Sequence, residues 1–105
     1  MENKVLSYFG FAAKARKLVT GYNTCIYMME KRKIRLLILT EDLAENSVKK
    51  MISAAEKHRV PYKVYGSKEQ LSQITGNVDK GIFGITDDNF AKVISDGIDH
   101  IQSVK

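Results

Sequence analysis

The stretch that decides the fold runs from Gly21-Tyr22-Asn23-Thr24 to Leu36-Leu37-Ile38-Leu39-Thr40-Glu41-Asp42. Gly21 predicts a turn that opens a helix, because glycine often marks such breaks in a pattern. The run at 36–40 consists of leucine and β-branched residues and predicts a strand buried on both faces. Glu41 and Asp42 end that strand in a loop. Backbone amides at a helix start favour an anion, so the Gly21 turn is a candidate binding site.

Outward from this stretch, helix and strand patterns alternate along the chain. Apolar spacing and capping residues predict five helices, over 4–15, from Asn23 or Thr24 to about 31, over 45–57, from Ser67 to Gly76, and from Asp87 or Asp88 to about 101. Strands are expected at 18–19, 34–40, 62–65 and 82–85. We therefore predict one domain, residues 1–105, of the α/β class, with a central sheet of about four strands and helices on both faces.

The composition is ordinary for a soluble globular domain. Hydrophobic residues make up 44% of the 105 residues and charged residues 28%, and the sequence has no repeat or biased tract. The longest apolar run is too short to cross a bilayer, and the first residues lack the layout of a signal peptide. Cys25 is the single cysteine and is expected to be a buried structural thiol. These features predict a cytoplasmic protein with no metal, cofactor or membrane partner.

The positive charge is concentrated in the first third of the chain. The formal net charge is +5, and residues 1–35 hold eight basic against two acidic side chains, whereas residues 36–105 hold nine against ten. Such an asymmetry is typical of a surface that binds nucleic acid. A solvated basic face without a partner is the alternative that charge alone leaves open. The basic side chains expected to hold phosphates are Lys14, Arg16, Lys17, Lys31 and Lys33.

Several motifs in fixed order resemble one protein family. They are Gly21-x-Asn23, the segment 36–42, and Val60-Pro61-Tyr62-x-Val64-x-x-Ser67-Lys68-x-x-Leu71 followed by Gly76. Over roughly residues 4–95 the chain is similar to the kink-turn RNA-binding ribosomal proteins, L7Ae and its relative L30e. The segments 10–21 and 86–92 resemble the bacterial branch of that family, whose members are small stand-alone proteins.

The resemblance implies a three-layer α/β/α sandwich with a central sheet of about four mixed strands. It also implies a non-catalytic, monomeric protein that docks on structured RNA, ribosomal or otherwise related to translation, with no DNA partner. Family members grip RNA that bends at tandem sheared G·A pairs, with one loop in the opened major groove and a second loop over a flipped-out nucleotide. Carried over to this chain, the first surface is Thr20, Gly21, Tyr22, Asn23, Thr24 and Tyr27, with Glu41 and Asp42 nearby, and the second is Gly76, Asn77, Val78 and Asp79.

Two positions depart from the pattern of strong kink-turn binders. Thr24 stands where glutamate is common, and Tyr27 stands where lysine is common. Each missing pairing with guanine corresponds to about 1–3 kcal/mol of discrimination, so we expect altered selectivity for G·A pairs. A protein-binding adaptor of the same fold, with weakened RNA readout, is the alternative. An enzyme is not expected, because the sequence has no nucleophile–base pair, metal-ligand spacing or phosphate-loop signature.

Overall fold

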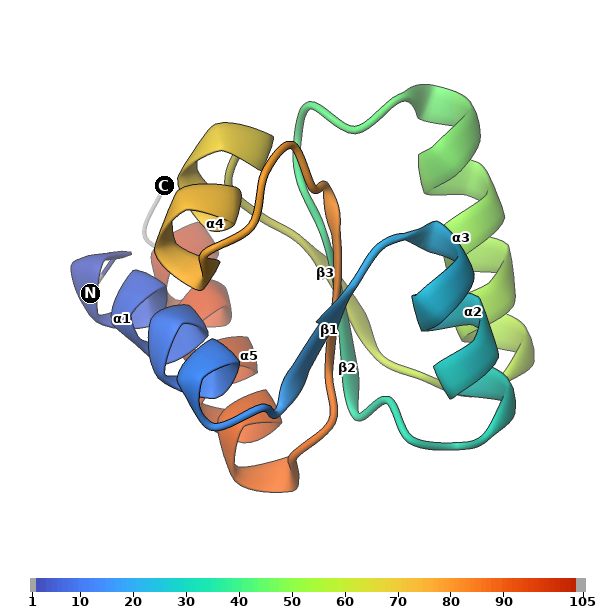
Figure 1. Ribbon diagram of the computed structural model, residues 1–105, viewed down its shortest axis with the longest axis horizontal. Helices are drawn as coiled ribbons and strands as arrows, with labels where there is room; N and C mark the ends of the chain where they lie inside the picture. The colour runs from blue at the N-terminus through green and yellow to red at the C-terminus, as the bar shows by residue number, and fades with distance from the viewer. Residues whose placement is uncertain (1, 104–105) are drawn as a thin grey trace.

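A four-stranded sheet forms the centre of the computed structural model, which describes residues 2–103 (Figure 1). Along the chain the elements are α1 (Glu2–Lys14), β1 (Leu18–Thr20), α2 (Tyr22–Glu30), β2 (Leu36–Leu39), α3 (Glu45–Lys57), β3 (Tyr62–Val64), α4 (Lys68–Thr75), β4 (Ile82–Ile85) and α5 (Asp88–Ser103). The predicted alternation of helices and strands is confirmed. Within these residues, no helix is long and apolar enough to span a membrane.

The strands lie in the order β1-β4-β2-β3, and the sheet is mixed. β2 pairs with β3 in parallel, whereas β4 is antiparallel to both β1 and β2. The carboxyl ends of β1, β2 and β3 and the amino end of β4 therefore meet at one edge of the sheet, which lies at the top of Figure 1 and is called the upper edge here. The opposite edge, where α1, α2 and α3 end, is the lower edge.

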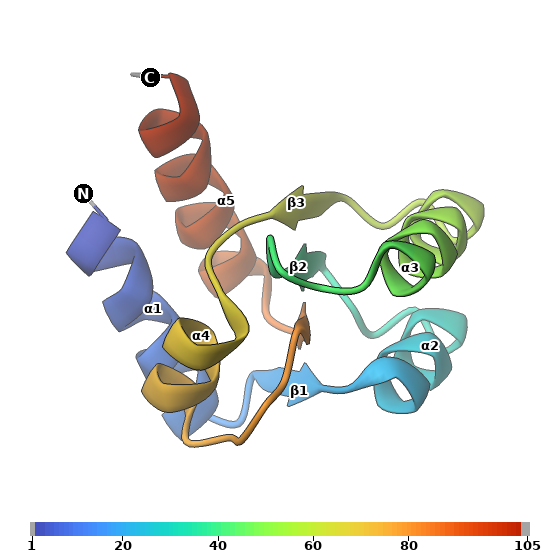
Figure 2. The same cartoon turned by 90° about the horizontal axis from the view of Figure 1, so that it is seen from above.

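Helices cover both faces of the sheet, as Figure 2 shows from above. α1, α4 and α5 pack together on one face, and α2 and α3 lie side by side on the other. The start of α1 and the end of α5 lie on the same side of the molecule, in the layer away from α2. The three-layer α/β/α sandwich is therefore confirmed.

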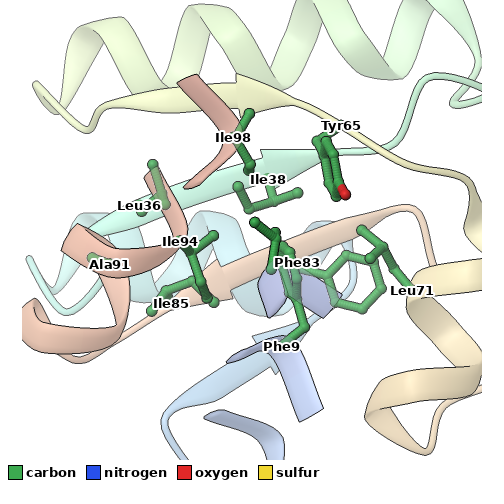
Figure 3. Close-up of a cluster of buried hydrophobic side chains, with 11 residues drawn as sticks. Phe9, Leu36, Ile38, Tyr65, Leu71, Phe83, Ile85, Ala91, Ile94 and Ile98 are labelled. Carbon is green, nitrogen blue, oxygen red and sulfur yellow. The ribbon is translucent and has the colours of Figure 1, made fainter. Parts of the chain in front are cut away.

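The protein has a hydrophobic core on each face of the sheet. The leucine and isoleucine residues of β2 contribute to both, because side chains alternate between the two faces along a strand. Leu36 and Ile38 pack in the core beneath α1 and α5, where Phe9 stacks near Tyr65 (Figure 3). Leu37 and Leu39 pack in the second core, beneath α2 and α3. All four β2 side chains are buried, which confirms the predicted strand with two buried faces.

Most predicted helix ends are confirmed. α3 has the predicted bounds, Ser67 accepts a hydrogen bond from Gln70 N–H at the start of α4, and Gly76 ends α4 in the left-handed conformation. Asp87 caps α5, since its carboxylate accepts from Phe90 N–H at 2.9 Å. Asn23 or Thr24 was expected to cap or open α2, and the capping role is wrong, because both residues lie inside the first turn. The N-cap is Gly21, the residue whose turn was predicted to open the helix.

Candidate nucleic-acid interface

Gly21 joins β1 to α2 in a backbone conformation, φ 96° and ψ 158°, that residues with a side chain rarely adopt. Its N–H donates to Ile82 O at 3.0 Å, and its carbonyl accepts from Cys25 N–H at 3.1 Å. A Cβ at Gly21 would meet no atom within 4 Å. The position thus requires glycine for its backbone, and the space beside it is open to a ligand.

The first turn of α2 presents backbone N–H groups toward the upper edge. The first N–H groups of an α-helix have no partner inside the helix, and no side chain of the described residues caps them here. The first turn also contains no acidic residue that would oppose an anion. These amides and the positive end of the helix dipole attract a phosphate or another anion.

One face of α2 carries polar and aromatic side chains into solvent. Asn23, Tyr27 and Lys31 follow one another at four-residue spacing and therefore share that face. Tyr27 is 56% exposed and Tyr22 is 40% exposed. The Lys31 ammonium lies 5.5 Å from the centroid of the Tyr27 ring, a cation–π contact that covers one side of the ring.

The opposite face of α2 holds the helix on the sheet. Cys25 and Met29 are fully buried there. Burial raises the pKa of the Cys25 thiol to about 12, so the thiol stays protonated at neutral pH. The expected structural thiol is confirmed, because a buried, protonated thiol is not a nucleophile.

Ser72 fixes the loop that follows α4. Its carbonyl accepts from Asn77 N–H at 2.7 Å. Its buried hydroxyl accepts from Lys80 N–H at 2.8 Å and donates to Lys80 O at 3.1 Å. The loop is therefore tied to α4 at both ends by hydrogen bonds within the protein.

The tip of this loop exposes an apolar side chain. Val78 is 84% exposed, more than any other large hydrophobic residue among those described. Asp79 beside it has a left-handed backbone, φ 52°, and the Asn77 side chain turns back to donate to Thr75 Oγ1 at 3.0 Å. The loop thus exposes the Val78 side chain, whereas the Asn77 amide is already bonded to Thr75, the last residue of α4.

The acidic end of β2 has a structural partner. The Asp42 carboxylate accepts from the Lys68 N–H at the start of α4, at 3.1 and 3.3 Å. The Thr40 hydroxyl beside it and the Lys68 amide hold the pKa of Asp42 below its usual range. Glu41 is bound through its backbone, its N–H donating to Gly66 O at 2.8 Å. Both acidic residues are exposed, but they lie on the β3 side of the upper edge, two strands from Gly21.

The structure brings the Gly21 turn and the Val78 loop together at the upper edge. Gly21 N–H bonds to Ile82, the first residue of β4, and the Val78 loop leads directly into β4. Gly81 lets the chain between this loop and β4 pass close to the end of β2, because a Cβ there would lie 2.9 Å from Thr40 Oγ1. Sequence reasoning missed the roles of Ser72 and Gly81 in positioning the chain. For Ser72, the available signal is that a serine follows Leu71 on the buried face of α4.

The basic residues expected to flank the Gly21 turn lie at the lower edge. They precede β1 or follow α2: Lys14, Arg16, Lys17, Lys31 and Lys33. β1 separates Lys17 from Gly21 by about 13 Å, and α2 separates Lys31 from Gly21 by about 15 Å. Both separations exceed the screening length of about 8 Å at physiological salt, so these charges act weakly on an anion at the turn.

Comparison with known proteins places these features in one group. A model of the ribosomal protein L7Ae/L30e/S12e/Gadd45 family matches residues 3–95. RNA-binding protein YlxQ of Bacillus subtilis (strain 168) is 34% identical over 87 residues, which cover 82% of this chain and 87% of that protein. RNA-binding protein YlxQ of Enterococcus faecium is 32% identical over 89 residues, 85% of each chain.

Solved structures show the same fold. A protein of unknown function from Bacillus halodurans C has a TM-score of 0.88 and 29% identity, over 91% of this chain and 97% of that chain. The Giardia lamblia 15.5kD RNA binding protein has a TM-score of 0.78 over 99% of this chain and 89% of that chain. At 21% identity, this similarity supports a shared fold alone.

Proposed function

The chain belongs to the ribosomal protein L7Ae/L30e/S12e/Gadd45 family, and we propose that it is a non-catalytic protein that binds structured RNA through its upper edge. The observation that carries the proposal is the pairing of an uncapped helix start at Gly21 with the exposed Val78 loop beside it. The names of the relatives from Bacillus subtilis and Enterococcus faecium support RNA as the ligand class.

In this proposal the Gly21 turn receives the RNA backbone. A phosphate or sugar approaches Gly21 closely because no side chain stands in the way. The free N–H groups of the first turn of α2 donate to phosphate oxygens, and Thr20 lies next to them at the end of β1. The amide of Asn23, which is exposed and does not cap the helix, is free to donate to and accept from a base edge.

The Val78 loop and the tyrosines would contact unstacked bases. An exposed valine on a fixed loop offers an apolar surface to a flipped-out nucleotide, and Gly76, Asn77 and Asp79 shape that loop. Tyr22 and Tyr27 add aromatic faces on the α2 side. A kink-turn, in which a base is extruded beside an opened groove, is the RNA shape that fits this pair of surfaces.

The selectivity of the site for G·A pairs depends on α2. Thr24 supplies a hydroxyl where the family pattern has a carboxylate, and the Lys31 ammonium over Tyr27 offers a donor one helical turn from the usual lysine. We propose that the chain binds a kink-turn with reduced preference for its G·A pairs. Glu41 and Asp42 would orient basic side chains or solvent near the RNA and not contact bases, because Asp42 already bonds to Lys68.

The basic residues of the lower edge would contact an RNA only where it extends past the loops. Lys14, Arg16, Lys17, Lys31 and Lys33 are exposed and would hold phosphates. Lys31 differs from the others because its ammonium also lies over the Tyr27 ring on the face of α2 proposed to meet the G·A pairs. A monomeric, cytoplasmic protein acting on ribosomal or other translation-related RNA completes the proposal.

The test compares a kink-turn RNA with the same RNA lacking its G·A pairs. We expect Asn23→Ala to weaken binding of the kink-turn RNA by about 1–3 kcal/mol and to affect a plain duplex less. Asn89→Ala is the matched control, since Asn89 is the exposed second residue of α5, as Asn23 is of α2. If wild-type protein binds neither RNA at low salt, the proposal fails; a stoichiometric protein partner that survives nuclease treatment would favour the adaptor function instead.

A further inference from the structure

The ends of α2 and α3 form a basic pocket at the lower edge, far from the Gly21 turn. The two helices lie side by side, and the loops that follow them both lie at the lower right of Figure 1. A pocket of about 360 Å³ opens there. Its lining consists of cationic side chains and one histidine, Arg32, Lys57, His58 and Arg59.

Both arginines of the pocket occupy a backbone conformation that normally favours glycine. Arg32 and Arg59 both have φ 58°, in the left-handed region. The two turns repeat the same pair of hydrogen bonds, Arg32 N–H to Met29 O and Lys33 N–H to Met28 O after α2, and Arg59 N–H to Glu56 O and Val60 N–H to Ala55 O after α3. Gly76 ends α4 in a similar turn without this strain. The turn after α1 has the same form at Arg16, φ 59°, so the left-handed arginine is not peculiar to the pocket. The pocket nevertheless has one arginine from the end of each helix.

The positive charge of the pocket has no acidic partner within residues 2–103. The ion pairs there join Arg35 to Asp88, Lys49 to Glu45, Lys63 to Asp99 and Lys92 to Asp96. None of them includes a lining residue of the pocket. Three like charges in one concavity repel one another, and a bound anion would relieve that repulsion. The negative ends of the two helix dipoles oppose an anion here, although three carbonyls at each helix end already accept hydrogen bonds, so the attraction must come from the side-chain charges.

We propose that this pocket binds a phosphate of a second RNA segment, so that the protein bridges two parts of a folded RNA. Guanidinium groups suit phosphate because they donate two parallel hydrogen bonds. The volume is near the lower limit of ligand pockets and accommodates a phosphate with part of its sugar. This inference builds on the proposed RNA-binding function, but it concerns different residues.

The two sites are electrostatically separate. From Gly21 to Arg32 the chain follows the whole of α2, a rise of about 16 Å. That distance is about twice the screening length at physiological salt. A phosphate at the upper edge therefore leaves the lower pocket charged and free to bind.

The test uses amide chemical shifts of the intact protein and two probes, a plain RNA duplex and inorganic phosphate. We expect the duplex to shift the amides of Arg32, Lys33, Arg59 and Val60 at micromolar concentration, whereas inorganic phosphate does so only in the millimolar range. Adding the duplex to protein already saturated with kink-turn RNA should give a ternary complex. Pocket amides that stay unmoved by the duplex, or that move at the same concentration of inorganic phosphate, would overturn the inference.

The variant for this test is Arg32→Gly with Arg59→Gly. Both substitutions relieve a left-handed backbone, so the protein is expected to fold. Duplex binding should weaken about tenfold, and the slope of log affinity against log salt should become shallower by about one for each phosphate that is no longer bound. The control Lys4→Gln with Lys92→Gln removes the same charge from exposed positions in the other helical layer and should change affinity less than twofold.

If the two double variants weaken binding equally, the pocket has no special role and the inference is wrong. Failure of the proposed function would appear elsewhere, as a kink-turn RNA that leaves the amides of residues 22–24 unmoved.

Discussion

Replacing Gly21 by alanine tests the turn at the centre of the upper edge. The added Cβ meets no atom within 4 Å, so the expected penalty is backbone strain alone. A residue forced into such a sparsely populated region costs about 2 kcal/mol. For 105 residues the unfolding entropy is about 0.22 kcal/mol per kelvin, so we expect the melting temperature to fall by about 9 °C. Thermal unfolding followed by circular dichroism measures this change.

The same variant separates the stability of the turn from its contact with RNA. A domain of ordinary stability remains folded at 25 °C after losing about 2 kcal/mol, so a lower affinity there reports the binding surface. We expect kink-turn RNA to bind at least about tenfold more weakly, because the methyl group occupies the space that a phosphate would enter. A melting temperature within about 2 °C of wild type would refute the strained turn. A full drop with unchanged affinity would refute its role in binding.

Three further outcomes follow from the site. Ser72→Ala should destabilise the protein by about 2 kcal/mol in urea unfolding, because it leaves the Lys80 backbone groups unpaired. Cys25, with a pKa of about 12, should resist alkylation at pH 8 in the folded protein and react once urea unfolds it; rapid labelling of folded protein would contradict its burial. The Asp42 carboxyl should have a pKa below its ordinary value of 3.8. Its contribution to stability should therefore be present above pH 3.8 and be lost as the pH falls through the folded-state pKa. A pKa of 3.8 or higher, measured from the carbon-13 shift of this carboxyl, would contradict the prediction.

The parts of the fold that sequence predicted are those set by local chemistry. α3 was predicted at its observed bounds because its apolar positions repeat with helical spacing, and Gly76 was predicted as a helix end because glycine adopts the left-handed conformation readily. The start of α2 was predicted in part: the Gly21 turn was expected to open the helix, but capping preference favoured Asn23 or Thr24 as its first residue. The backbone of Gly21, which its pairing with Ile82 fixes, starts the helix instead.

The candidate site was predictable only in part. Gly21 and the loop around Val78 are far apart in sequence, and the family resemblance alone linked them before β4 placed them side by side. The basic residues show the reverse case, in which residues close together in sequence lie far apart in the fold. Lys17 and Lys31 are close to Gly21 in sequence, but β1 separates Lys17 from it and α2 separates Lys31 from it, so both residues lie at the lower edge. Sequence distance is a poor guide wherever a whole element intervenes.

The placement of the first and last helices has a practical consequence. α1 begins and α5 ends on the same side of the molecule, in the layer away from α2 (Figure 2). A dye, affinity tag or surface linker attached at either end would therefore extend away from the Gly21 turn and from the basic pocket. Protein immobilised in this way would present both edges to solution, so capture of one RNA by the upper edge and of another by the lower edge could be recorded on the same molecule.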